Sequence, residues 1–321
     1  GSAVDPLLHP GYVDYKGDDC SYESVYEHGM EWLQYVKEHG LGWGINDLFR
    51  FGDFLLPNMK HIHPIYQSDK EAISSLYGDI TEIWQCTHTH RTNAINKGIF
   101  SWRDKRLNSS ILKVPSHCAY TVDMILKMNR GEIDSDYFPI KLTLDTHQFR
   151  DETNEMFVDF ETVRDSLDFE YESGTETIFL IGVYYKGSYR SFRLDRIENE
   201  REMIRDFLNY WRENGKPKCW YWYAEKMMWQ RAMHRVNLNN ENDINWVDLY
   251  EVVKNESFVI KDCKNFKLKS YVKSLKELGK IDVELPPAGC SNGLDALIIA
   301  WKYYTSLANG ENDDNLKQSF D

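Results

Sequence analysis

The chain has 321 residues and a mass of 37.9 kDa, a length that at about 100–200 residues per domain predicts two domains, or one large domain with an appendage. Hydrophobic residues make up 42% and charged residues 28%, which excludes a disordered chain, a coiled coil and a collagen-like fibre. The net charge of −13 excludes a protein whose whole surface attracts polyanions. It leaves room for a local basic stripe or for metal ions held by carboxylates.

The sequence also indicates a cellular setting. It contains no run of about 18 uncharged apolar residues, so we expect no membrane partner. The first residues lack the charged and apolar regions of a secretory signal. None of the six cysteines forms a CxxC pair, which indicates reduced thiols and an intracellular protein of the cytoplasm or nucleus.

The first 150 residues are expected to be mainly helical. Apolar residues recur there with the period of an amphipathic helix, and Gly and Pro separate the periodic segments. The predicted helices cover residues 21–39, 69–86, 90–97, 101–106 and 115–130.

The pattern changes near residue 150, after a polar linker over 145–154. Three strands are expected first, the last two joined by a turn at Gly187 and Ser188, and helices then alternate with strands. The predicted strands are 156–160, 177–185, 189–194, 218–223 and 244–249, and the predicted helices are 199–213, 225–236, 266–278 and 294–308. This order predicts an α/β fold over 151–308, with a five-stranded mixed sheet and flanking helices that resembles ribonuclease H. Residues 309–321 are polar and are expected to be a disordered tail.

The most informative segment is Val158-Asp159-Phe160-Glu161-Thr162. Two acids at positions i and i+2 of a strand point to the same face. Burying them in an apolar strand costs several kcal/mol unless a cation compensates, and hard divalent cations prefer carboxylate oxygen. The alternative is a strand end that carries two solvated acids.

Two more acids could complete such a site. Glu225 follows a predicted strand and opens a helix, and Asp295 lies in the first turn of the last helix. Each could instead only complement a helix dipole. Together with Asp159 and Glu161, they supply the four carboxylates that hold two divalent ions about 3.5–4 Å apart in two-metal nucleases.

In this arrangement the chain resembles the DEDD family of 3′–5′ exonucleases. The resemblance is carried by residues 158–162, 221–225 and 293–296, and it extends to 246–253 and 265–270. It is closest to the ribonuclease-H-like domain at the C-terminus of predicted RecB-family nucleases. The resemblance implies that Asp159, Glu161, Glu225 and Asp295 are catalytic and bind two Mg²⁺ or Mn²⁺ ions. It also implies a nucleic-acid substrate, DNA rather than RNA, an upstream nuclease domain or partner, and a viral or phage source.

One position departs from the family. Better-known members place Tyr or His four residues before the last Asp as the general base, whereas this chain has Ser291, and a serine hydroxyl is a poor base near pH 7. Either the attack proceeds without a protein base, or Lys269 orients the water, or the chain is catalytically impaired. Asp248, at the end of a predicted strand, is a spare carboxylate and a possible accessory residue.

Lysines are concentrated in residues 261–280. Lys269, Lys273, Lys276 and Lys280 are spaced 4, 3 and 4 residues apart, which on a helix gives one stripe. The stripe is either the solvated side of an amphipathic helix or a surface that contacts phosphates.

Residues 84–107 resemble a degenerate helix-hairpin-helix, with Thr87-His88-Thr89-His90 in place of the usual Gly-x-Gly hairpin. The sequence as a whole predicts a metal-dependent nuclease, a 3′–5′ exonuclease on DNA that uses two metal ions. The alternative is a catalytically impaired module of the same fold that binds nucleic acid or a partner.

Overall fold

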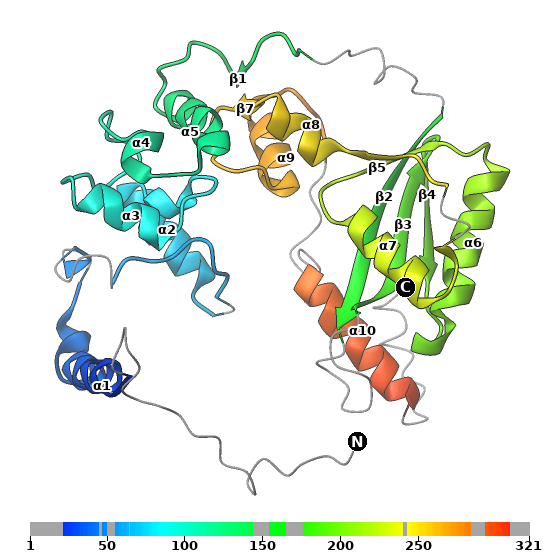
Figure 1. Ribbon diagram of the computed structural model, residues 1–321, viewed down its shortest axis with the longest axis horizontal. Helices are drawn as coiled ribbons and strands as arrows, with labels where there is room; N and C mark the ends of the chain where they lie inside the picture. Colours follow the sequence, from blue (N-terminus) through cyan, green and yellow to red (C-terminus); the bar gives the residue numbers. More distant parts are fainter. Residues whose placement is uncertain are drawn as a thin grey trace, which may run out of the picture.

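A five-stranded mixed sheet lies at the centre of the C-terminal half of the chain in the computed structural model (Figure 1). The structure describes residues 22–44, 47–49, 55–63, 65–143, 154–164, 176–239, 243–283 and 293–308. The strands of this sheet are β2 Glu155–Arg164, β3 Glu176–Tyr185, β4 Ser188–Arg193, β5 Lys218–Tyr221 and β6 Trp246–Asp248. Their order is β4-β3-β2-β5-β6, which confirms the predicted α/β class with five strands and flanking helices.

The sheet combines two kinds of pairing. Strands β2, β3 and β4 form an antiparallel meander, while β5 pairs parallel to β2 and β6 pairs parallel to β5. In this register Asp159 lies opposite Gly182, and a bulge interrupts the β2–β3 pairing between Glu161 and Thr162. The last β5 partner of β2 is Trp220, opposite Phe157, so Asp159 and Glu161 lie beyond the end of that parallel pairing.

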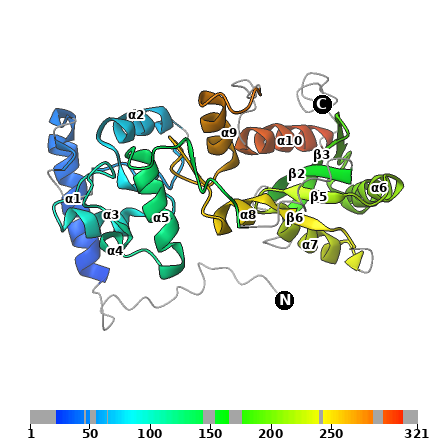
Figure 2. The ribbon, with the colours of Figure 1, turned by 90° about the horizontal axis from the view of Figure 1, so that it is seen from above.

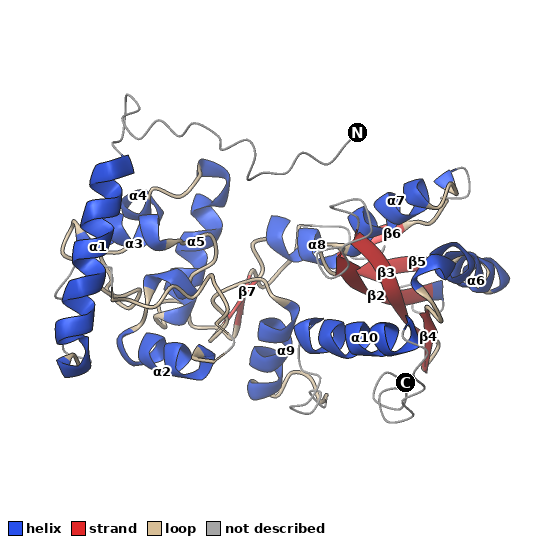
Figure 3. Cartoon of the chain, turned by 90° about the horizontal axis from the view of Figure 1, so that it is seen from below, coloured by secondary structure: helices blue, strands red, loops and turns tan. Residues whose placement is uncertain are grey.

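Helices cover the sheet on both sides. They are α6 Glu200–Glu213, α7 Glu225–Arg235 and α10 Gly293–Ala308, and α7 and α10 lie on opposite sides of the sheet (Figures 2 and 3). The Phe160 ring is 6.0 Å from that of Trp229 on α7. Because side chains alternate along a strand, Asp159 and Glu161 face the other side, where α10 lies.

A second hydrophobic core belongs to the helical part of the chain. Its elements include α3 His88–Ile95, α4 Ser109–Leu112 and α5 Ser116–Asn129, and α1 Tyr22–His39 and α2 Gln67–Tyr77 precede them. Residues far along the sequence join this core, including Val259, Ile260, Phe266 and Tyr271. Val259 and Ile260 form β7, which pairs with β1 Tyr137–Phe138. Tyr271 lies on α9 Leu268–Glu277, and Phe266 lies between β7 and α9. The helix α8 Leu249–Asn255 precedes them.

The predicted domains divide at residue 150. The two hydrophobic cores do not divide there, because the second core contains residues from both sides of that position. The segment from β7 to α9 was assigned to the C-terminal domain, but its apolar side chains pack against α5 and its neighbours. Residues 145–153 of the linker predicted over 145–154, and the predicted tail over 309–321, lie outside the described residues.

Two of the helices predicted in the first half differ in the structure: one ends early, and the other is not a helix. The helix expected over 69–86 ends at Tyr77, because Gly78 adopts a left-handed φ of 78° and Asp79 then caps a short 3₁₀ helix, Ile80–Glu82. Residues 101–106 form turns instead of a helix. The backbone N–H of Trp102 donates a hydrogen bond there to the carbonyl oxygen of Gly78 at 2.9 Å. This contact between separate segments takes the place of a local helix. The expected helix-hairpin-helix over 84–107 thus contains α3 as its only helix.

Asp79 and Arg91 form a buried ion pair in this core. The Arg91 Nη1 is 2.7 Å from Asp79 Oδ2, with side-chain exposures of 2% and 0%. Arg91 also donates to the carbonyl oxygens of Leu56 and Pro57, and the Tyr77 hydroxyl donates to Asp79. One guanidinium thus ties together three segments that are separate in the sequence.

Two observations bear on the cellular setting. Among the described helices, none is both long and apolar enough to cross a membrane. Cys86, Cys118, Cys219 and Cys263 are buried free thiols, whereas Cys20 and Cys290 lie outside the described residues.

Candidate active site

Asp159 lies close to two of the other acids predicted from the sequence, Glu161 and Glu225. The side chains of Asp159 and Glu225 are hydrogen-bonded to each other, and Glu161 lies within electrostatic range of Asp159. Solvent reaches Asp159 from the open side of the sheet, Glu161 is half-buried and Glu225 is buried. Because β2 extends past the end of β5, the turn after β5 places Glu225 beside Asp159.

Burial raises the pKa values of all three acids. Burial is the largest cause at each, and at Glu161 and Glu225 the charge of Asp159 adds to it. The pKa of Glu225 rises from 4.5 to about 7. Asp159 has a raised pKa although solvent reaches it, because protein surrounds it on its other sides. Its solvent exposure is the better guide to whether a ligand can reach it.

Two carboxylates can share a hydrogen bond only if one of them holds a proton. A proton shared between Asp159 and Glu225 would leave the pair with one negative charge instead of two. A divalent cation could replace that proton, and the donor atoms are the carboxylate oxygens that Mg²⁺ and Mn²⁺ prefer. Asp159, Glu161 and Glu225 thus fit a hard divalent ion by their chemistry. Within the described part of the chain, however, no group of three His, Cys, Asp or Glu side chains is assembled closely enough to hold a metal ion.

The fourth predicted ligand, Asp295, lies in the first turn of α10. Its side chain is outside the described part of the structure, as is the whole of Ser291. The helix that carries Asp295 contacts β2, the strand of Asp159 and Glu161.

Lys269 lies beside the carboxylates. It occupies the first turn of α9, is exposed, and its charge lowers the pKa values of Asp159 and Glu161 against the effect of burial. The other lysines of the predicted stripe have different surroundings. Lys273 and Lys276 lie exposed on α9, with Lys273 4.0 Å from Glu277. Lys280 lies beyond the end of the helix and pairs with Asp136 at 2.9 Å, so the prediction of four lysines on one helix is wrong for Lys280.

Asp248 has a structural role of its own. It is the N-cap of α8, and its Oδ1 accepts hydrogen bonds from the backbone N–H groups of Tyr223, Tyr250 and Glu251 at 3.2, 2.9 and 3.3 Å. Its charge nevertheless helps to raise the pKa of Glu225, so it lies at the margin of the site.

Tyr189 was not predicted. It lies on β4, and its hydroxyl is 3.1 Å from the position that a Cβ on Gly182 would occupy. Burial and the charge of Asp159 raise the pKa of this hydroxyl. The signal in the sequence was the glycine itself, because a glycine inside a strand often marks the close approach of another group.

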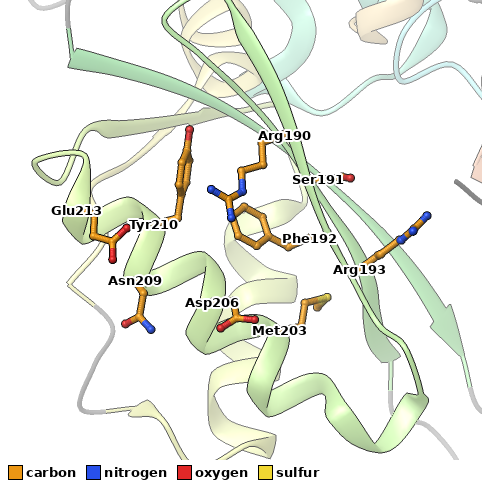
Figure 4. Close-up of a pocket in the computed structure, with 9 residues that line it drawn as sticks. All are labelled: Arg190, Ser191, Phe192, Arg193, Met203, Asp206, Asn209, Tyr210 and Glu213. Carbon is orange, nitrogen blue, oxygen red and sulfur yellow. The ribbon is translucent and has the colours of Figure 1, made fainter.

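A cavity in the described part of the chain lies away from these carboxylates. It has a volume of about 570 Å³ and lies between β4 and α6 (Figure 4). Arg190 stacks there on Phe192 and Tyr210, at 4.8 and 4.6 Å from the ring centres. Asp159, Glu161 and Glu225 do not line it, so the candidate active site is separate from this cavity.

Comparison of the chain with protein-family models, with curated proteins and with solved structures returned no match.

The titration of Glu225 has a consequence for stability. Between pH 4.5 and about 7 the folded chain holds a proton that the unfolded chain has lost, so the free energy of unfolding falls as the pH rises through this window. In a metal chelator, Glu225→Gln should be more stable than the wild type above pH 7, by up to about 3 kcal/mol. The difference should vanish below pH 4.5. Urea unfolding at several pH values measures it, and Glu213→Gln, an exposed change on α6, is the control. Parallel profiles for wild type and Glu225→Gln would contradict the raised pKa.

Proposed function

We propose that the chain is a metal-dependent nuclease of the ribonuclease-H-like, DEDD type. It would hydrolyse phosphodiester bonds from the 3′ end of DNA with two Mg²⁺ or Mn²⁺ ions. The observation that carries the proposal is the approach of Glu225 to Asp159, because Glu225 lies more than 60 residues away from Asp159 in sequence, whereas Glu161 lies on the same strand as Asp159. The strand order agrees with that fold type, because β5 pairs parallel to the first strand of an antiparallel meander and β6 pairs parallel to β5.

The proposal assigns a role to each of the acids and to Lys269. Asp159, Glu161 and Glu225, with Asp295, would hold the ions through carboxylate oxygens. In such sites the ions supply activation of the attacking water and stabilisation of the leaving oxygen. Lys269 would hold a phosphate oxygen beside the acids, because its ammonium group is the cation within range of both Asp159 and Glu161.

Two observations favour the alternative, a catalytically impaired module that binds nucleic acid or a partner. The described acids include no closely assembled group of three, and Ser291 stands where the family has its general base. Such a module would keep the fold and the basic residues but would not cleave.

Cleavage of labelled strands separates the two functions. Single-stranded DNA, double-stranded DNA and single-stranded RNA, labelled at the 5′ end, are incubated with the chain with and without millimolar Mn²⁺. The proposal expects Mn²⁺-dependent shortening from the 3′ end, and faster cleavage of DNA than of RNA. Intact strands in Mn²⁺, together with an unchanged melting temperature, would favour the impaired module.

The lysines of α9 give a separate expected result. Lys273→Gln combined with Lys276→Gln should weaken the binding of single strands of any sequence. The slope of log K against log salt should become shallower by roughly 1–2 units, since each phosphate contact contributes about 0.7. Lys37→Gln combined with Lys127→Gln removes the same charge from exposed sites of the helical part and should leave the slope unchanged. Equal slopes for both double variants would mean that α9 presents only a solvated face.

A further inference from the structure

Three aromatic side chains form a row on the face of the sheet that also carries Asp159. Phe157 on β2 lies opposite Tyr184 on β3, and Tyr184 lies opposite Tyr189 on β4. Directly opposed residues point to the same side of a sheet, and all three are exposed, at 44%, 50% and 67%. We call Phe157, Tyr184 and Tyr189 the aromatic row.

The aromatic row adjoins the carboxylates. Phe157 precedes Asp159 by two residues on the same strand, which places the two residues about 7 Å apart on one face. Tyr189 extends toward the same point, because its hydroxyl and Cε2 lie 3.1 and 3.5 Å from the place of a Cβ on Gly182, the residue opposite Asp159. The missing side chain of Gly182 thus leaves room for the outer part of the Tyr189 ring.

The charges next to the aromatic row indicate the kind of ligand that binds it. The three rings are uncharged, while the neighbouring site offers the ammonium group of Lys269 and carboxylates that fit divalent cations. A matching ligand presents flat uncharged groups to the rings and anionic groups to the cations. A single strand of nucleic acid has both in alternation, whereas a duplex hides the faces of its bases. A second copy of the chain would bring a like net charge of −13.

We propose that the aromatic row is a base-stacking platform, on which the bases next to the scissile phosphate of a single strand lie while that phosphate is at Asp159. This inference rests on the proposed nuclease function and assigns its substrate class, a single-stranded end. Stacking on aromatic rings tolerates any sequence, because every base has a π face.

Binding to two strands of equal length and charge tests the platform. One is a fluorescein-labelled thymidine oligonucleotide of about 12 residues, and the other is its abasic counterpart. Affinity is measured by fluorescence anisotropy at low salt in a chelator, where metal-dependent cleavage cannot occur. Tyr184→Ala and Tyr189→Ala should each weaken binding of the thymidine strand at least about fivefold and leave binding of the abasic strand unchanged. Tyr184→Phe keeps the ring and should keep the affinity. Tyr120→Ala, at a tyrosine on α5 that is 57% exposed, is the matched control.

The outcomes separate the platform from the nuclease function. Wild-type affinity in both alanine variants would overturn the platform, whatever the cleavage assay shows. Sedimentation that reveals a wild-type dimer, lost in the alanine variants, would also overturn it, because the row would then be a contact between copies. Base-dependent binding that needs the rings, in a chain that cleaves nothing in Mn²⁺, would support the platform and refute the proposed nuclease.

Discussion

Asp159→Asn is expected to reduce Mn²⁺-dependent cleavage by about a thousandfold or more, while the fold is kept. The substitution preserves the shape of the side chain but removes the charge that lies closest to the other acids. Interactions with a catalytic metal contribute several kcal/mol to the stabilisation of a transition state, and about 4 kcal/mol corresponds to a thousandfold change in rate. Single-turnover cleavage of a 5′-labelled single strand measures the loss.

Thermal unfolding of the same variant gives an independent result. Like charges at close range repel, so the variant should unfold without metal at the wild-type temperature or above it. Added Mn²⁺ should raise the wild-type melting temperature more than that of the variant. Asp206→Asn, an exposed change on α6, alters the net charge equally and should affect neither cleavage nor the metal response. A variant Asp159→Asn that cleaves like the wild type would refute the assignment of the site.

Arg91→Met is expected to have the largest effect on stability, a loss of about 3–5 kcal/mol. The substitution leaves the carboxylate of Asp79 buried at 0% exposure without its cation, and a buried unpaired charge is far more costly than a lost surface contact. The backbone carbonyls of Leu56 and Pro57 lose a donor at the same time. Urea unfolding, followed by circular dichroism, measures the free energy of unfolding.

Arg106 provides the control for this prediction. Its Nη2 is 2.6 Å from Asp104 Oδ2, an even shorter contact, but the arginine side chain is 64% exposed. Arg106→Met should therefore leave the free energy of unfolding nearly unchanged, because water solvates the carboxylate that remains. Adding Asp79→Asn to Arg91→Met should recover part of the loss, since it removes the isolated charge. Equal effects of Arg91→Met and Arg106→Met would show that burial of the pair does not matter.

Local patterns in the sequence were sufficient for the elements of the sheet and for their class. Residues 177–185 and 189–194 appear as β3 and β4 within one residue at each end, and 199–213 appears as α6. Apolar periodicity and turn residues act over a few neighbouring positions, so they can be identified without knowing what packs against them. The spacing of Asp159 and Glu161 on one strand likewise predicted that both would face the same side.

Contacts between distant elements were decided only by the tertiary structure. Gly78 ends a helix that its apolar residues would have continued, because Asp79 turns inward to meet Arg91. Residues 259–271 join the helical core, although their place in the chain predicted that they belong to the C-terminal domain. Asp248 caps a helix, and Tyr189 lies over Gly182 beside Asp159. Local propensity does not specify which side chains meet across elements, since that depends on how the helices and strands pack together. The sequence by itself therefore determined which residues could form the site, and the packing of β2, α7 and α9 decided which of them meet there.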